Sequence, residues 1–201
     1  MKLPDFKGAI QYALTRLEQE LPASLSYHSV RHTRDGVVPA VERFAAWNGV
    51  DDAALLLLRT AAWFHDLGFV EQRIDHEAIG VRIAAFVLPH FGYTPAQIVT
   101  IGGMIMATKL PQSPNTPLEE LVVDADLDLL GRTNFLERNQ DLRNELAAYG
   151  MTLSDDEWYR DQLAFLQNHR YWTTVARTLR DEQKHRNIAA LKELLARCCA
   201  S

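Results

Sequence analysis

The chain has 201 residues, of which 47% are hydrophobic, 9% aromatic and 23% charged. This composition excludes a disordered or fibrous chain and fits one ordinary globular domain with its own core. The 21 basic and 26 acidic residues leave a formal net charge of −5, which argues against nucleic acid or an anionic membrane as the main partner.

The cysteines and the first residues bear on the compartment. Cys198 and Cys199 are adjacent, so they lack the spacing of a disulfide framework or of a zinc ligand set. The opening sequence MKLPDFKGAI has no long apolar stretch after its lysine, so we expect no signal peptide. The longest apolar run is also expected to be too short for a bilayer, which needs about 20 residues. We therefore expect a cytoplasmic protein without a membrane partner.

The first half of the chain predicts three helices, because apolar residues recur there at three- and four-residue spacing. These helices are expected over residues 6–21, 29–47 and 52–67. Their ends are marked by Pro22, Asn48-Gly49 and Gly68. The second helix is expected to bend near Pro39, and Asp51 or Asp52 is expected to cap the third.

The second half continues the same pattern. Six further helices are expected near residues 75–90, 95–107, 118–130, 133–149, 155–169 and 173–197. Alternating runs of strand length are scarce, and no repeat or long linker divides the chain. The segment 109–117, with three prolines, is the clear candidate for an ordered loop. We predict an all-α fold, with residues 1–201 forming a single domain.

Two polar features do not fit a plain apolar core. The third predicted helix is apolar almost all round, which predicts burial, yet it ends in His65-Asp66. A buried carboxylate without a partner costs several kcal/mol, so such groups are usually paired or bind metal. The alternative is that this histidine and aspartate face solvent at the end of the helix.

Asp126 is the second feature. At 100° per residue, the apolar residues of 118–130 fill one broad arc, and Asp126 lies in the middle of that arc. Asp124 and Asp128 fall on the far side, so only Asp126 is expected to point into the core. The alternative is a buried aspartate that accepts hydrogen bonds from a neighbouring helix.

His28 and His32 are four residues apart and share one face if this stretch is helical. Alone, the spacing also fits two surface histidines. Together with His65, Asp66 and Asp126, however, they supply a mixed imidazole and carboxylate set without thiolates. Such a set, completed by water, suits Mn²⁺, Fe²⁺, Co²⁺, Ni²⁺ or Mg²⁺ rather than structural zinc.

The order of these residues resembles the HD superfamily of metal-dependent phosphohydrolases and, more remotely, the cyclic-nucleotide phosphodiesterases. The likeness rests on His32, the His65-Asp66 pair and Asp126, in the contexts Tyr27-His28…His32-Thr33, Ala62-Trp63-Phe64-His65-Asp66 and Asp124-Ala125-Asp126-Leu127. It implies an HD-type helical bundle with a motif-bearing core at about residues 25–135 and C-terminal helices at 136–201.

The resemblance also implies roles for individual residues. The implied metal ligands, for one or two ions, are His32, His65, Asp66 and Asp126. His28 is implied as the catalytic acid that protonates the leaving oxygen, and Asp66 as a catalytic carboxylate that orients water. His76 and Glu77 are candidates for a second metal or for support of the ligands. Lys109 and Arg132 are candidates for binding phosphate, with solvated side chains as the alternative.

The implied activity is hydrolysis of a small phosphorylated substrate, foremost a nucleotide, by metal-activated water. Three alternatives stay open: a non-catalytic nucleotide-binding regulatory module of HD fold, a di-iron oxygenase of HD fold, and a helical interaction protein without metal. A homodimer also stays open, because aromatic residues such as Trp158 and Trp172 could form a contact between copies.

Overall fold

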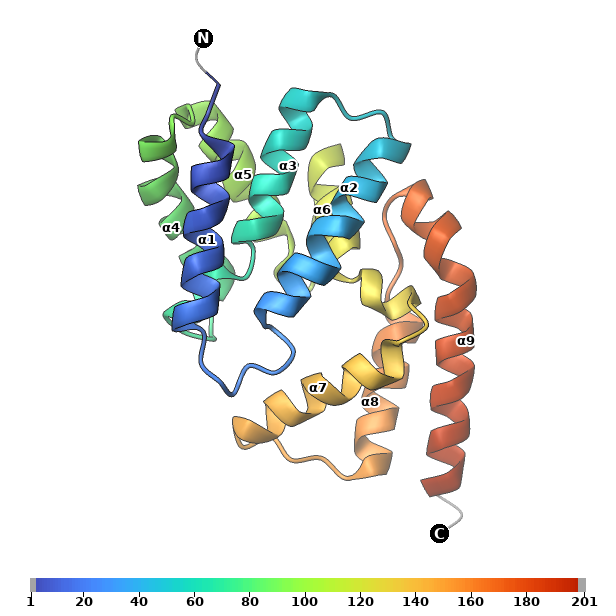
Figure 1. Cartoon of the computed structure of the whole chain (residues 1–201). Helices are drawn as coiled ribbons and strands as arrows, with labels where there is room; N and C mark the ends of the chain where they lie inside the picture. Colours follow the sequence, from blue (N-terminus) through green and yellow to red (C-terminus); the bar gives the residue numbers. More distant parts are fainter. Residues whose placement is uncertain (1–2, 199–201) are drawn as a thin grey trace. The chain divides into compact units, whose positions relative to one another are not determined.

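The computed structural model describes residues 3–198, and every regular element among them is a helix (Figure 1). In chain order they are α1 (Phe6–Glu20), η1 (His32–Val37), α2 (Val38–Trp47), α3 (Asp52–Phe64), η2 (Leu67–Val70), α4 (His76–Val87), η3 (Leu88–Phe91), α5 (Pro95–Ala107), α6 (Pro117–Asp126), η4 (Asp128–Gly131), α7 (Phe135–Ala148), α8 (Asp155–Asn168) and α9 (Thr174–Cys198). The η1 segment is π-helical, and η2, η3 and η4 are 3₁₀ turns. The all-α prediction is confirmed.

The chain forms two compact units. The first runs to Ala23 and continues from His28 to Asp126, and the second comprises Ser24–Tyr27 and the chain from Leu127 onward. We call them unit 1 and unit 2. That residues 1–201 form one domain stays a prediction.

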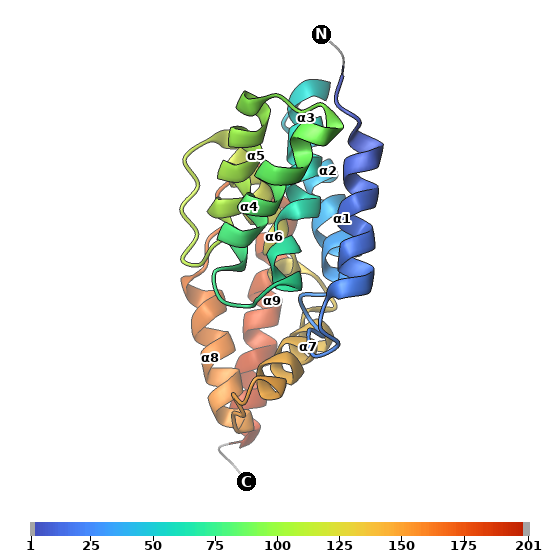
Figure 2. The ribbon, with the colours of Figure 1, turned by 90° about the vertical axis from the view of Figure 1, so that its left-hand side faces the viewer.

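Helix α3 is the centre of unit 1. It contacts α1, α2, α5 and α6 (Figure 1), and Figure 2 brings α4 and α5 to the front. Its side chains from Thr60 to Phe64 are all buried, as its apolar composition predicts. The last turn of α3 therefore carries the His65-Asp66 pair into the interior of unit 1.

The segment Asp52–Val70 corrects one expectation. It has 19 residues and a mean hydropathy of 1.3, so by length and composition alone it could cross a membrane. Of the 18-residue apolar stretch within this segment, 61% is buried inside the protein. The central helix of a globular protein passes the same test, and the packing of α3 accounts for its apolar character.

Helix α6 corrects two further expectations. It ends at Asp126, four residues earlier than predicted, and the chain continues as the 3₁₀ turn η4. Asp124 and Asp128, predicted to face outward, are only 0% and 2% exposed. Asp124 is covered because α6 contacts α2, α3 and α5. Asp128 lies in unit 2 and accepts two hydrogen bonds from the Arg180 guanidinium, at 2.5 and 3.1 Å.

Unit 2 has its own core. The buried side chains Leu130, Phe135, Leu166 and Leu191 pack together there. The Ser24–Tyr27 segment joins this unit through the backbone N–H of Tyr27, which donates to Oε2 of Glu145 at 2.9 Å. Trp158 is buried, whereas Trp172 is exposed. Cys198 is a free thiol near the end of α9, and Cys199 lies outside the described residues.

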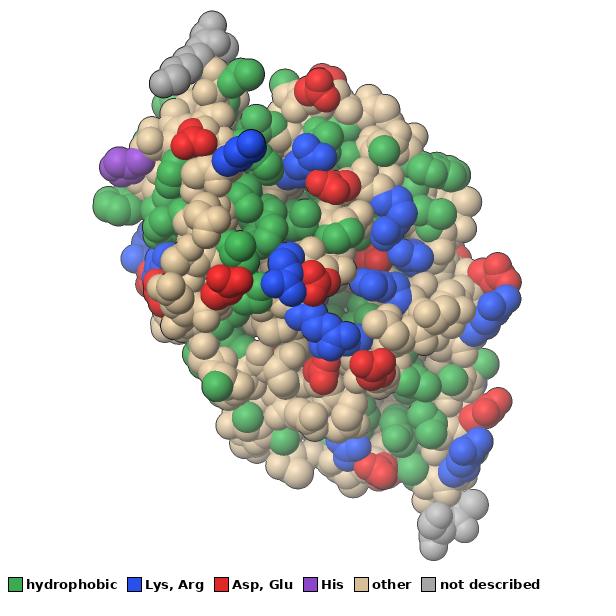
Figure 3. All heavy atoms as spheres, in the orientation of Figure 1, with side chains coloured by type: hydrophobic (Ala, Val, Ile, Leu, Met, Phe, Trp, Pro, Cys, Tyr) green, Lys and Arg blue, Asp and Glu red, His purple; other side chains and the backbone are tan. Residues whose placement is uncertain are grey.

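Charged side chains of both signs share the surface. On the face drawn in Figure 3, Lys and Arg side chains lie beside Asp and Glu side chains. Surface pairs in unit 1 include Arg16 with Glu20, at 2.5 Å, and Arg59 with Glu42, at 2.9 Å. Exposed pairs of this kind contribute little to stability.

Candidate metal centre

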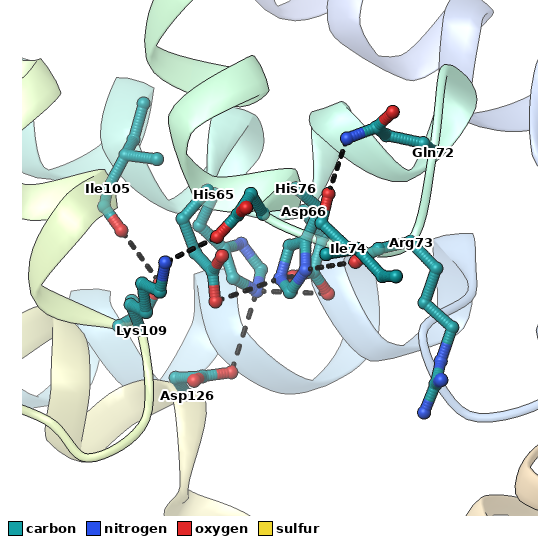
Figure 4. A network of polar contacts seen from close by, with 12 residues as sticks. His65, Asp66, Gln72, Arg73, Ile74, His76, Ile105, Lys109 and Asp126 are labelled. Atoms are coloured by element: carbon teal, nitrogen blue, oxygen red, sulfur yellow. Dashed lines mark hydrogen bonds and ion pairs between the residues drawn. The ribbon is translucent and has the colours of Figure 1, made fainter.

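The four predicted ligands meet inside unit 1. His32 begins η1, His65 and Asp66 follow α3, and Asp126 is the last residue of α6. Nε2 of His32 lies 3.1 Å from Oδ1 of Asp126 and 3.6 Å from Oδ2 of Asp66. Nε2 of His65 lies 3.2 Å from Oδ2 of Asp66 and 3.5 Å from Oδ1 of Asp126 (Figure 4). Two imidazole nitrogens and two carboxylate oxygens therefore face one small space.

Two atoms of this cluster show that its residues fit a metal ion. Nδ1 of His65 donates to the carbonyl oxygen of Ala62 at 2.7 Å, which directs Nε2 at the carboxylates. Nε2 of His65 and Oδ2 of Asp66 are both buried and have no hydrogen-bond partner among the described residues. Ligand atoms of His32, His65 and Asp66 all lie within 4.8 Å of one another. A divalent cation among them would bind both Nε2 of His65 and Oδ2 of Asp66, and imidazole nitrogen and carboxylate oxygen are ligands that such ions accept.

The charged groups of the cluster shift one another's pKa values. Burial lowers the pKa of His65, but the negative charges of Asp66 and Asp126 more than offset it and raise the pKa well above the ordinary value. Burial raises the pKa of Asp66 and Asp126, yet the imidazoles of His65 and His32 hold the pKa of both carboxyls well below their usual range. In the absence of metal, a protonated His65 therefore lies beside two carboxylates.

Asp66 faces two groups of side chains. Its Oδ2 atom faces His32 and His65, while its Oδ1 atom lies 3.6 Å from Nε2 of His76. The same nitrogen of His76 lies 3.4 Å from Oε1 of the buried Glu77. Nδ1 of His76 donates to the carbonyl oxygen of Arg73 at 3.1 Å. His76 and Glu77 are thus next to the cluster. Asp66 is the residue that lies between them and the two histidines His32 and His65.

Gly68 allows the start of α4 to lie against η2. A Cβ at Gly68 would lie 1.9 Å from the carbonyl oxygen of His76 and 2.9 Å from the backbone nitrogen of Gly80. The sequence prediction placed Gly68 after the end of a helix reaching Leu67, but α3 ends at Phe64. A close approach of backbones, not a helix end, is the reason that glycine is needed here.

We expect Gly68→Ala to lower the free energy of unfolding by about 1–3 kcal/mol, because the added methyl group must displace the backbone of α4. Chemical denaturation measures the change. Gly103→Ala is the matched control, since its Cβ would meet only the flexible end of Glu119, at 2.9 Å. Equal destabilisation by both variants would contradict this account.

The remaining predicted residues lie in different places. His28 precedes η1 and is half-buried, and its ring centroid lies 6.0 Å from that of His32. Lys109 lies beside the cluster in Figure 4, and its Nζ atom lies 2.5 Å from Oδ1 of Asp75. Arg132 belongs to unit 2, where its carbonyl oxygen accepts a hydrogen bond from Asn187 at 2.9 Å.

No protein-family model matches this chain, and no curated protein matches it. A solved structure described as a predicted HD superfamily hydrolase from an uncultured Thermotogales bacterium is similar, with a TM-score of 0.64 and 17% sequence identity. The likeness covers 96% of this chain and 93% of the other. This chain has an HD-type fold.

The HD-type fold confirms the fold that the motif resemblance implied. In it, the His65-Asp66 pair follows the buried helix α3, and the residues that meet the pair come from η1 and α6. Phe69 stacks on His28 and His76, and Asp75 pairs with Lys109, although the sequence offered no signal for either. The comparison with cyclic-nucleotide phosphodiesterases stays a prediction.

Proposed function

We propose that this chain is a metal-dependent phosphohydrolase of the HD superfamily that acts on a nucleotide or another small phosphate ester in the cytoplasm. The observation that carries the proposal is that Nε2 of His65 and Oδ2 of Asp66 lie buried 3.2 Å apart where the described ligands converge, and that neither atom makes a hydrogen bond among the described residues. The similar HD-type structure, described as a predicted hydrolase, supports the class of reaction.

The residues of the cluster have distinct roles in this proposal. The ion would be held by His32, His65, Asp66 and Asp126, and Mn²⁺, Fe²⁺, Co²⁺, Ni²⁺ and Mg²⁺ suit this set. A bound divalent ion lowers the pKa of water and neutralises charge on phosphate oxygens. Asp66 or Asp126 orients the attacking water, and His28, half-buried beside His32, protonates the leaving oxygen.

The position of Asp66 favours one second candidate. Because its two oxygens face His32 and His65 on one side and His76 on the other, the chain could hold two ions. Two ions with His76 and Glu77 among their ligands would also suit a di-iron oxygenase of HD fold. The two candidates differ in what they consume, a phosphate ester or dioxygen.

Metal content and phosphatase turnover, measured in parallel, test the proposal. We expect native protein reconstituted with each ion to hold about one or two ions and to hydrolyse a nucleotide, a cyclic nucleotide or an aryl phosphate. Asp126→Asn should lose both metal and turnover. Asp128→Asn, two residues along and paired with Arg180, is the matched control and should keep both.

Each other outcome points elsewhere. Metal without turnover of any phosphate ester would contradict the phosphohydrolase and favour the regulatory module or the oxygenase. No metal after reconstitution would overturn the site, leaving Asp126 as a half-buried acceptor of hydrogen bonds in a helical interaction protein.

Lys109 offers a further prediction, because it is paired with Asp75 where a phosphate would compete for it. If Lys109 binds the substrate, Lys109→Ala should raise KM about fivefold with little change in kcat. Asp75→Asn frees the ammonium group and should lower KM. Lys192→Ala, on the exposed side of α9, is the control for loss of charge. Unchanged KM in both Lys109→Ala and Asp75→Asn would show that the pair is only a surface contact.

A further inference from the structure

Phe69 lies against two of the candidate histidines. It is in η2, three residues after Asp66, and is 3% exposed. Its ring centroid is 3.8 Å from that of His76 and 4.7 Å from that of His28, with an interplanar angle of 24° in both pairs. The centroids of the two imidazoles are 6.3 Å apart, so the three rings form a compact triangle.

Near-parallel contact constrains an imidazole in a way that hydrogen bonds do not. The ring nitrogens lie at the edge of the ring, so a neighbour on its face fixes the plane and leaves both nitrogens available. His76 shows the effect. Nδ1 is held by the carbonyl oxygen of Arg73, but one hydrogen bond leaves the ring free to tilt about that atom. The phenyl face of Phe69 removes this freedom.

The backbone of Phe69 ties this phenyl ring to the cluster. Its N–H donates to the carbonyl oxygen of Asp66 at 3.1 Å, so the ring and the central carboxylate belong to one short turn. Gly68 lies between them and brings α4 close enough for His76 to reach the phenyl ring. By comparison, the phenyl ring of Phe64 stacks on Tyr12, with centroids 6.5 Å apart, and not on a candidate histidine.

We propose that Phe69 is a positioning residue that fixes the ring planes of His28 and His76. In this role it keeps Nε2 of His76 directed at Asp66 and Glu77 and keeps the imidazole of His28 beside His32. The consequences for turnover rest on the proposed function, whereas the consequences for the ring planes do not.

Phe69→Leu tests the proposal, because it keeps an apolar side chain but loses the flat face. In metal-free protein, we expect the imidazole nitrogen resonances of His28 and His76 to shift or broaden, with those of His90 as an internal reference. In Mn²⁺-loaded protein, we expect kcat to fall about 10- to 100-fold with little change in KM, the size of effect seen for residues that orient metal ligands. Phe69→Tyr keeps the face and should restore native behaviour.

Phe44→Leu is the matched control, since Phe44 is also buried in unit 1 and is packed in α2. It should lower thermal stability without moving the imidazole resonances or kcat. If Phe69→Leu does not fold, Phe69→Met preserves more of the side-chain volume and replaces it. The same response from the Phe69 and Phe44 variants in the spectra would overturn the proposal and make Phe69 an ordinary core residue. Absence of turnover in native protein would instead reject the phosphohydrolase, while the metal-free spectra still decide the role of Phe69.

Discussion

Asp66→Asn is expected to release bound metal and to lower turnover by on the order of 10³-fold, because a metal ion supplies several kcal/mol of charge stabilisation and each 1.4 kcal/mol is tenfold in rate. The effect should exceed that of losing any other single ligand, since one oxygen of Asp66 faces His32 and His65 and the other faces His76. An amide has the same shape but no charge to hold the ion. Elemental analysis and single-turnover kinetics measure the two losses.

Glu145→Gln is the control for Asp66→Asn. Glu145 is also a buried carboxylate, but it lies in unit 2, where it accepts a hydrogen bond from the backbone of Tyr27. This substitution should reduce stability and leave metal content and kcat near native values. Retention of stoichiometric metal by Asp66→Asn would show that Asp66 is not a ligand.

Metal-free protein should become less stable as pH rises above about 6.5, and bound metal should reverse this trend. The pKa of His65 is raised on folding, so its contribution to stability is complete below the unfolded value of 6.5 and is lost as pH rises through the folded pKa. The pKa values of Asp66 and Asp126 are lowered, so their contribution is present above the unfolded value of 3.8 and is lost only as pH falls through the folded values. The cluster without metal therefore stabilises most between about pH 4 and 6.5.

A metal ion and a proton compete for Nε2 of His65, so the stabilisation by bound metal should also depend on pH. While His65 remains protonated in the metal-free protein, affinity for the ion should rise about tenfold per pH unit. Thermal denaturation from pH 5.5 to 8.5, in chelator and in excess Mn²⁺, should show a gap that widens with pH. A gap that stays constant, with chelated protein gaining stability above pH 6.5, is the result that would contradict a protonated His65.

Most helices could be predicted because their evidence is local. The apolar period gave α5 its bounds at 95–107 and gave α8 to within one residue. The period could not locate the end of α6, because apolar residues continue through Leu130 although the helix stops at Asp126. Asp128 was misplaced for this reason, since its position on the wheel assumed a helix that is not there.

In the candidate site, too, local features could be predicted from the sequence, whereas contacts between distant segments could not. The burial of His65 and Asp66 followed from the apolar helix before them. Their grouping with His32 and Asp126 rested on residue type and on the family resemblance, because His32 and Asp126 are 94 residues apart in sequence. The closeness of His28 and His32 does not come from one α-helical turn, because His28 precedes the helix and η1 is π-helical. The approach of His76 depends on backbone contact at Gly68, which no sequence pattern encodes.

The hydrogen bond from His65 to the carbonyl oxygen of Ala62 bears on whether the chain folds before or after it binds an ion. It holds the imidazole by its own helix end, so the ring is oriented whether a proton or an ion occupies its other nitrogen. A newly made chain can therefore complete its fold with His65 protonated, before any ion is present. On the proposed function, loading of the ion would then exchange one cation for another inside a folded protein, and it would release a proton.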